Sequence, residues 1–208
     1  MTLAPEGPVR RISALVIFCF LFLGLVPSFC SAQVASRWDV FGGFSARRFD
    51  STTIGYKDYS YLYGWNAQGA INITLKFGAV LDLSGNYGSK LDVYNFMIGP
   101  QYSWRRDKSR FFVHGLFGKG QVRVNIPNAP PNLGGNNPQQ PGRSYFESVG
   151  KAFGGGGGFD VDLSPRITVR VFQADFLRND TFGASQNDFR VSGGLVFHFG
   201  HIGHRPKL

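Results

Sequence analysis

Residues 65–86 read WNAQGAINITLKFGAVLDLSGN and contain two runs in which apolar and polar residues alternate. In residues 65–73 the odd positions are apolar or glycine, and the even positions carry Asn, Gln, Ala and Asn. Residues 79–86 repeat the pattern, with leucines alternating with aspartate and serine. Successive side chains of a β-strand point to opposite faces, so each run predicts a strand with one apolar and one polar face. A short link around Lys76 would join them.

The same alternation recurs along the rest of the chain, in segments of about ten residues separated by polar turns. These further segments are residues 38–47, 94–105, a less regular one beginning at Phe111, 151–163, 167–176 and 189–199. No later stretch is apolar for long enough to predict a transmembrane helix. The pattern therefore predicts an all-β protein, a transmembrane up-and-down antiparallel β-barrel of about eight strands.

The composition excludes two other classes of protein. The chain is 43% hydrophobic and only 17% charged, whereas a disordered chain needs low hydrophobicity and many charges. Its 21 Phe and 28 Gly are in excess, while helical bundles are rich in Ala, Leu, Glu and Lys. The formal net charge of +9 indicates an anionic partner.

The first 32 residues predict a secretory signal peptide. Arg10 and Arg11 precede an uncharged run over residues 12–26, and Cys30-Ser31-Ala32 supplies small residues before a cut after Ala32. The alternative is an uncleaved membrane anchor, although the run is shorter than the roughly 20 residues that span a bilayer. We therefore expect a signal peptide over residues 1–32 and one barrel domain over residues 33–208. Export argues against a nucleic-acid partner and favours lipid headgroups or surface polysaccharide.

The connections between the segments alternate in length. Short links are expected near Lys76 and at residues 105–110 and 164–166. Longer connections are expected at residues 50–61, 88–93, 122–150 and 177–188, and a short C-terminal tail at residues 200–208. Short turns at one end and long loops at the other are typical of barrels in a bacterial outer membrane. We expect the loop over residues 122–150, rich in Pro, Asn, Gln and Gly, to be the most exposed.

Charged residues on the polar faces decide which face meets lipid. These residues are Asp82, Asp160, Asp162, Arg170 and Arg190. Charges of both signs can pair inside a small barrel, which has room for side chains and little else, so the aromatic face is expected to point outward. The alternative is a soluble lipocalin-like barrel with its apolar face inside. The interior charges would form either a salt-bridged plug or an ion-selective lumen.

Two positions conflict with this pattern. Pro100 falls inside a predicted strand, where it cannot donate a hydrogen bond to a neighbouring strand, and a closed barrel has no edge to accommodate it. Asp175 and Arg170 are an odd number of residues apart, so they cannot share a face without a bulge. We predict that bulge near Phe172.

Aromatic residues gather near the ends of the predicted strands rather than along their whole length. Trp65, Tyr87 and Tyr94 lie next to longer connections, and Trp38 and Trp104 lie toward the opposite end. Amphipathic rings prefer the membrane–water interface, so we expect these five residues to form two interfacial belts.

The last predicted strand contains Ser192-Gly193-Gly194-Leu195-Val196-Phe197-His198-Phe199. This pattern of a polar residue, a glycine and two aromatics spaced by one resembles the C-terminal assembly signal of outer-membrane β-barrels. The chain thus resembles the OmpA-like and OmpX-like family of small outer-membrane barrels over nearly all of residues 33–199. The resemblance implies that the barrel-assembly machinery reads Ser192, Gly194, Phe197 and Phe199.

Candidate chemistry in the sequence is sparse. The glycines of residues 154–158 lack the Lys-Ser/Thr of a phosphate-binding loop. His198, His201 and His204 are spaced by three, but a metal site needs ligands that converge. His114 has no evident serine partner for nucleophilic catalysis. We therefore expect no catalysis, cofactor or metal.

These observations predict a monomeric barrel in the bacterial outer membrane, with outer-membrane lipid and lipopolysaccharide as its partners. Its expected role is structural, or a surface interaction through the long loops. Two alternatives remain at this point: a narrow porin-like channel for ions or small solutes, and a barrel enzyme that modifies lipid A.

Overall fold

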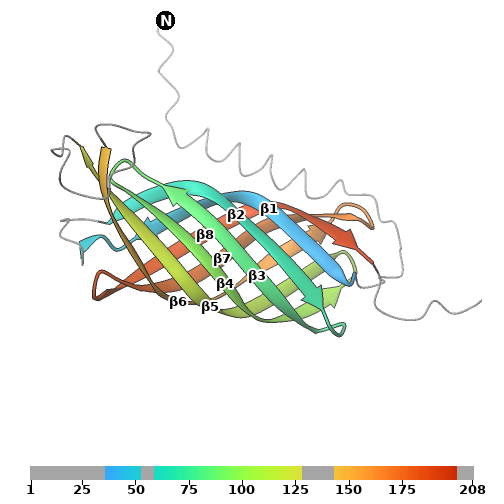
Figure 1. Ribbon diagram of the computed structural model, residues 1–208. Coiled ribbons are helices and arrows are strands. Elements are labelled where there is room, and N and C mark those ends of the chain that lie inside the picture. The colour runs from blue at the N-terminus through green and yellow to red at the C-terminus, as the bar shows by residue number, and fades with distance from the viewer. Residues whose placement is uncertain (1–35, 53–58, 128–142, 201–208) are drawn as a thin grey trace, which may run out of the picture. The chain divides into compact units, whose positions relative to one another are not determined.

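The computed structural model describes residues 36–52, 59–127 and 143–200. This part of the chain forms eight strands (Figure 1). They are β1 (Trp38–Phe49), β2 (Ser60–Asn72), β3 (Phe77–Tyr87), β4 (Leu91–Arg106), β5 (Ser109–Pro127), β6 (Arg143–Asp162), β7 (Ile167–Thr181) and β8 (Ala184–Phe199). No helix within the described residues has the length and apolar character needed to cross a membrane.

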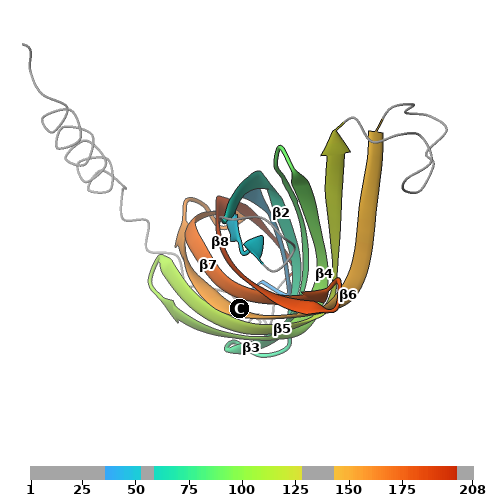
Figure 2. The same ribbon diagram turned by 90° about the vertical axis from the view of Figure 1, so that its left-hand side faces the viewer.

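Each strand pairs antiparallel with the next, and β8 pairs with β1 to close the barrel. The closing pairs run from Trp38 opposite Phe199 to Phe49 opposite Asp188. Figure 2 shows the strands curving around one ring. The predicted up-and-down antiparallel barrel of eight strands is confirmed. Closure matters physically because it leaves no unpaired sheet edge in contact with hydrocarbon.

The two faces of the sheet differ in the way that a membrane barrel requires. Large apolar side chains are exposed on the outside of every strand, among them Phe44, Phe96, Phe117, Phe153 and Phe176. Charged and amide side chains on the other face are buried in the lumen. Hydrocarbon solvates the first set, and the second must find partners inside.

The connections are shorter than predicted at several places. β3 and β4 are joined across residues 88–90, and β7 and β8 across residues 182–183, so the longer connections expected at 88–93 and 177–188 are wrong. The predicted loop over residues 122–150 is also too long, because β5 continues to Pro127 and β6 begins at Arg143. Strands that extend beyond the hydrocarbon no longer need one apolar face, so the alternation fades before the hydrogen bonding stops.

The β7–β8 connection is a tight two-residue turn. Phe182 and Gly183 have φ angles of 53° and 73°. Positive φ at both central residues is the requirement of a type I′ hairpin turn, whose twist matches that of the strands it joins. This geometry explains how β7 and β8 stay paired up to Thr181 and Ala184.

The bulge predicted near Phe172 is confirmed. The register of β7 shifts between Arg170 and Gln173, and both Val171 and Phe172 point outward. This one extra residue restores Asp175 to the same inward face as Arg170.

The strand accommodates Pro100 by a local interruption of the ladder. Pro100 pairs with Ala79 of β3, but the pairing of β4 with β5 skips it and resumes at Gln101 opposite His114. The register on either side of the gap is unchanged. A closed barrel can thus hold a proline at the cost of one missing donor.

Three predictions concern residues outside the described ranges. The signal peptide of residues 1–32, the C-terminal tail beyond Gly200 and the central part of the 122–150 loop, residues 128–142, all lie there.

A closed barrel in which each strand pairs with both neighbours should resist unfolding by detergent at room temperature. We expect unboiled and boiled samples of the refolded protein to migrate differently in a detergent gel, because only boiling opens the ladder. Identical mobility, together with recovery of the protein in a soluble fraction, would instead support the lipocalin-like alternative.

Candidate functional site

The lumen holds clusters of buried charged side chains, and the first cluster is centred on Asp160 of β6. Nη2 of Arg110 lies 2.6 Å from Oδ2 of Asp160, and Nε of Arg170 lies 2.9 Å from Oδ1. Nη1 of Arg110 also donates to Oδ2 of Asp39 at 2.6 Å. All four side chains are no more than 4% exposed. Two arginines and two aspartates therefore neutralise one another where water is excluded.

The guanidinium of Arg170 is held between two aromatic rings. Its Cζ lies 4.4 Å from the ring centroid of Phe41 and 4.2 Å from that of Phe112. Its Nη1 donates to the side-chain oxygens of Gln68 and Gln173, each at 2.6 Å. Cation–π contacts gain strength when the cation is desolvated, so the rings stabilise this charge as well as fix its position.

A second cluster is centred on Arg190 of β8. Nη1 and Nη2 donate to the two carboxylate oxygens of Asp82 at 3.0 and 2.9 Å, a bidentate arrangement. Nε donates to Oδ2 of Asp175 at 3.0 Å. Nε2 of His114 lies 2.8 Å from the other oxygen of Asp175. Gln173 donates to Asp175 at 2.8 Å and accepts from Arg170, so it links the two clusters.

A third cluster lies nearer the long connections, around Arg47 of β1. Nη2 of Arg47 lies 2.5 Å from Oδ2 of Asp188, and Nη1 donates to Asn95 at 2.6 Å. Asn95 donates to Asn179, and Asn179 donates back to Asp188, each at 2.7 Å. The four side chains form a closed ring of hydrogen bonds across the lumen.

Apolar side chains also occupy the interior, although the sequence analysis expected a polar one. One buried cluster consists of Ala70, Val80, Met97, Leu116, Ala152 and Leu177. The other, which we call the apolar plug, consists of Phe49, Leu62, Leu91, Val93 and Val122, with Val124 packed against it. Phe49 ends β1, before the connection to β2, and Leu91 begins β4, after the connection from β3. Both connections lie at the same end of the barrel as the β5–β6 connection, so the apolar plug lies at that end.

At the opposite end of the lumen, His198 is held from two sides. Its Nδ1 lies 2.7 Å from Oδ1 of Asp39, and its Nε2 lies 2.7 Å from Oγ1 of Thr168. Ser36 contacts the same Nδ1 at 3.2 Å and donates to Asp39. Thr168 donates to Asp162 at 2.5 Å. Together these contacts connect β1, β6, β7 and β8 at the end with the short turns.

The carboxylate–imidazole–hydroxyl order of Asp39, His198 and Thr168 has the form of a nucleophilic triad. Thr168 is, however, fully buried, and its hydroxyl proton is directed to Asp162. Ser36 shares Nδ1 with Asp39 instead of facing the other ring nitrogen. No hydroxyl in this group is both aligned with a base and open to a substrate, so the arrangement is suited to holding the strands together.

The five predicted interior charges lie in these groups, although not all in one. Arg190 brings Asp82 together with Asp175, and Asp160 pairs with Arg170. Asp162 is half-buried and accepts a hydrogen bond from Oγ1 of Thr168. The sequence analysis missed four further members of the network: Asp39, Arg47, Arg110 and Asp188. His114 also belongs to it, and so does Asp175, through the predicted bulge. Most of these residues lie at the alternate positions that form a predicted polar face. Extending the alternation to both ends of each strand would therefore have found them.

The five aromatics predicted at the interfaces point outward. Four are exposed and Tyr94 is half-buried. Trp65 donates from Nε1 to the hydroxyl of Tyr87 at 3.2 Å, and the rings of Tyr87 and Tyr94 meet edge to face at 5.7 Å. Trp104 packs edge to face on Tyr102 at 4.5 Å near the other end.

The residues of the predicted assembly signal divide between the two faces of β8. Phe197 and Phe199 are exposed on the outside, whereas Ser192 is buried in the lumen. Gly194 lies against β1, where an added Cβ would be 2.3 Å from the carbonyl oxygen of Gly42. Glycine is therefore required there for the two strands that close the barrel to approach each other.

The glycine run of residues 154–158 lies within β6 and makes room in the lumen. An added Cβ at Gly156 would be 2.2 Å from Oδ1 of Asp175, and one at Gly158 would be 2.7 Å from the ring of Phe112. These glycines admit the side chains that make the ion clusters.

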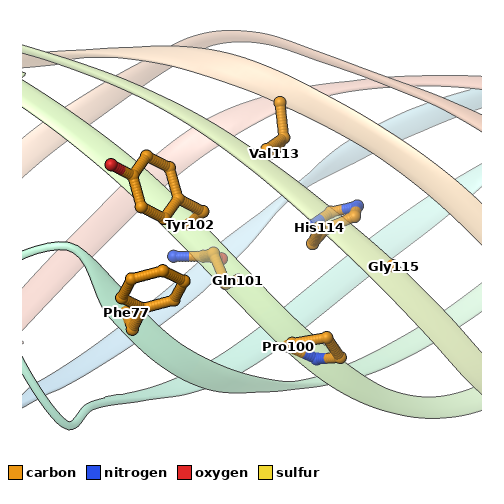
Figure 3. A pocket seen from close by; sticks show the side chains of 7 residues that line it. All are labelled: Phe77, Pro100, Gln101, Tyr102, Val113, His114 and Gly115. Atoms are coloured by element: carbon orange, nitrogen blue, oxygen red, sulfur yellow. The ribbon is translucent and has the colours of Figure 1, made fainter.

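A hollow of about 220 Å³ lies where Pro100 interrupts the β4–β5 ladder (Figure 3). Its lining includes the outward-facing Phe77, Tyr102 and Val113, together with Gly115 opposite the proline. The surface is apolar, and His114 directs its Nε2 away to Asp175. The hollow therefore offers contact to hydrocarbon and no reactive group.

In the part of the chain that the structure describes, no three His, Cys, Asp or Glu side chains are placed to hold a metal ion. His201 and His204 lie outside that part.

Removing Arg190 should leave Asp82 and Asp175 buried without their main counter-charge. We expect Arg190→Ala to lower the free energy of unfolding by about 3–5 kcal/mol, measured by denaturant titration in phosphatidylcholine vesicles. The control is Arg178→Ala, whose partner Asp180 is exposed at the barrel surface. That change should lower the free energy of unfolding far less, because solvent screens an exposed ion pair. Equal losses in the two variants would contradict a tightly coupled lumen.

No protein-family model matches this chain, and no curated protein does. Among solved structures, it is similar to Neisserial surface protein A (NspA), with a TM-score of 0.62 at 11% identity, covering 79% of this chain and 98% of that one. It is also similar to Ail, the attachment invasion locus protein of Yersinia pestis, with a TM-score of 0.51 at 14% identity, covering 78% and 99%. A complex of Ail with the heparin analogue sucrose octasulfate gives a TM-score of 0.52.

At this level of identity the similarity concerns the fold. It agrees with the closed ring of strands, the apolar exterior and the charged lumen seen in the described residues. The chain has the fold of the small outer-membrane β-barrels, as its resemblance to them predicts.

Proposed function

We propose that this protein is an integral β-barrel of the bacterial outer membrane, with a closed lumen and no catalytic activity. Its role is structural, or depends on contacts made at the end with the long connections. The observation that carries the proposal is the lumen itself, which is filled by three linked or neighbouring polar clusters and two apolar ones.

Location in a membrane is supported by the division of the two faces. Rings such as Phe44 and Phe117, each more than half exposed, would contact water unfavourably in a soluble barrel. The paired charges inside need no solvent. Barrels of this kind present short turns to the periplasm and longer loops to the cell surface, so we expect the β5–β6 connection to lie outside.

A closed lumen argues against the porin-like alternative. Bidentate pairing of Arg190 with Asp82 places side chains across the barrel, and the apolar plug adds a constriction without polar groups. A hydrophobic constriction blocks ions by excluding water, so each barrier alone would hinder conduction.

The buried histidine and hydroxyl of the lumen do not support the lipid-A enzyme alternative. Such chemistry needs a hydroxyl next to a base near the lipid-facing rim. His114 and Thr168 are buried in the lumen instead.

The cell-surface end offers an extended platform for contacts. β5 and β6 project beyond their neighbours, since β6 begins to pair with β7 only at Lys151 (Figure 2). We infer that the protein is a monomer that interacts there with lipopolysaccharide and outer-membrane lipid, after insertion by the barrel-assembly machinery. The complex of Ail with a heparin analogue indicates that a barrel of this fold can present an anion-binding surface.

Planar-bilayer recording tests the proposal directly. We expect the refolded wild-type protein to give no discrete conductance steps across many insertions, with a known porin as the positive control for the bilayer. The variant Phe49→Ala removes the largest side chain of the apolar plug. Conductance steps in the wild type, with larger steps in this variant, would assign the current to the lumen and overturn the proposal.

A further inference from the structure

Two lysines face each other across adjacent strands on the outside of the barrel. Lys119 of β5 is paired in register with Lys151 of β6, and both side chains are exposed. Side chains directly opposite in an antiparallel pair are about 5 Å apart at Cβ, and like charges at that spacing destabilise the sheet. Among the described residues neither lysine forms an ion pair, although Asp180 of β7 lies opposite Lys151 in register and interacts with it electrostatically.

Another charged residue on the outer face of β5, Arg123, has cross-strand neighbours of opposite charge. Arg123 of β5 pairs in register with Asp92 on one side and Glu147 on the other. Its Nε lies 2.9 Å from Oε2 of Glu147. Opposite charges thus flank Arg123 on both sides, whereas Lys119 faces Lys151 and only Lys151 faces a carboxylate, that of Asp180 on β7.

The lysines lie at the boundary between the apolar band and the cell-surface end. Two residues further into the barrel, Phe117 is paired with Phe153, and both rings are exposed. On the other side, Lys151 is level with the β7–β8 turn, where the backbone N–H of Phe182 donates to Ser148. Ammonium groups at this level reach the depth of lipid headgroups while their methylene stems cover apolar surface.

A third cation lies beside the pair. Arg178 of β7 is opposite Phe153 and points outward. It contacts Asp180 at 3.3 Å and donates to Ser185 at 2.7 Å. Asp180 offsets one of the three positive charges, so the patch formed by Lys119, Lys151 and Arg178 keeps a net positive charge facing the membrane surface.

We propose that Lys119 and Lys151, with Arg178 beside them, bind the phosphate groups of an outer-leaflet lipid headgroup such as that of lipopolysaccharide. An anion between the two ammonium groups would remove their mutual repulsion, and phosphate is the anion present at that depth. The exposed Phe117 and Phe153 lie directly below to contact the acyl chains. This inference rests on the proposed function, because it needs the barrel in a membrane with its long connections outward.

The test uses the full chain refolded in detergent micelles and native mass spectrometry with bis-phosphorylated lipid A. We expect the double variant Lys119→Gln/Lys151→Gln to bind this lipid roughly ten-fold or more weakly than the wild type, since each cation near an anionic headgroup contributes to binding. Lys119→Arg/Lys151→Arg should retain binding. The matched control, Lys76→Gln/Lys108→Gln, removes the same charge at the short-turn end and should behave as the wild type.

Dephosphorylated lipid A and millimolar inorganic phosphate complete the experiment. Weak binding of the dephosphorylated lipid, and failure of free phosphate to displace the intact one, would support a headgroup site. Equal affinity of both glutamine double variants, or displacement by free phosphate, would overturn the inference.

Each variant is also examined by heat-dependent gel mobility and bilayer recording. A folded, non-conducting barrel with unaltered lipid binding would reject the lysine site alone, whereas conductance in the wild type would reject the proposed function instead.

Discussion

Closing an eight-stranded sheet leaves an interior only wide enough for side chains, and every charge that enters it must find its counter-charge there. The barrel meets this constraint because single charged side chains pair with two side chains of opposite charge. Asp160 accepts from two arginines, and Arg190 donates to two aspartates. Because each partner comes from a different strand, the ion pairs also connect strands that are not adjacent in the ladder, such as β3 and β8 through Asp82 and Arg190. The polar interior thereby fixes the cross-section of the barrel and frees the outer face to be apolar.

The strand count and the direction of the two faces could be predicted from the sequence, because both follow from a period of two. The bulge could be predicted as well, because Arg170 and Asp175 are an odd number of residues apart and one extra residue between them puts both on the same face. The turn lengths could not. A two-residue turn at Phe182 and Gly183 has no Asn-Gly or Asp-Gly signal, and the strand ends beside it carry polar residues on both faces.

The composition of the lumen was also only partly predictable. The alternation assigns Leu62 and Phe49 to the inward face. They were nevertheless not predicted as interior residues, because the interior was expected to be polar. At the barrel end that holds the apolar plug, buried apolar side chains stabilise the interior by the same burial that stabilises a soluble core. Pairings such as Arg47 with Asp188 join residues 141 positions apart, and only the closed register of β1 with β8 brings them together.

The central claim is that the aromatic face contacts acyl chains while the ionic face is enclosed. The three tryptophans of the chain, Trp38, Trp65 and Trp104, are all exposed on the outer face near strand ends. Their fluorescence in vesicles made with brominated phosphatidylcholine reports contact with lipid directly. The account predicts strong quenching, greater for bromines near the headgroup than for bromines deep in the acyl chain, and little quenching by aqueous iodide. Quenching by iodide with none from brominated lipid would contradict it.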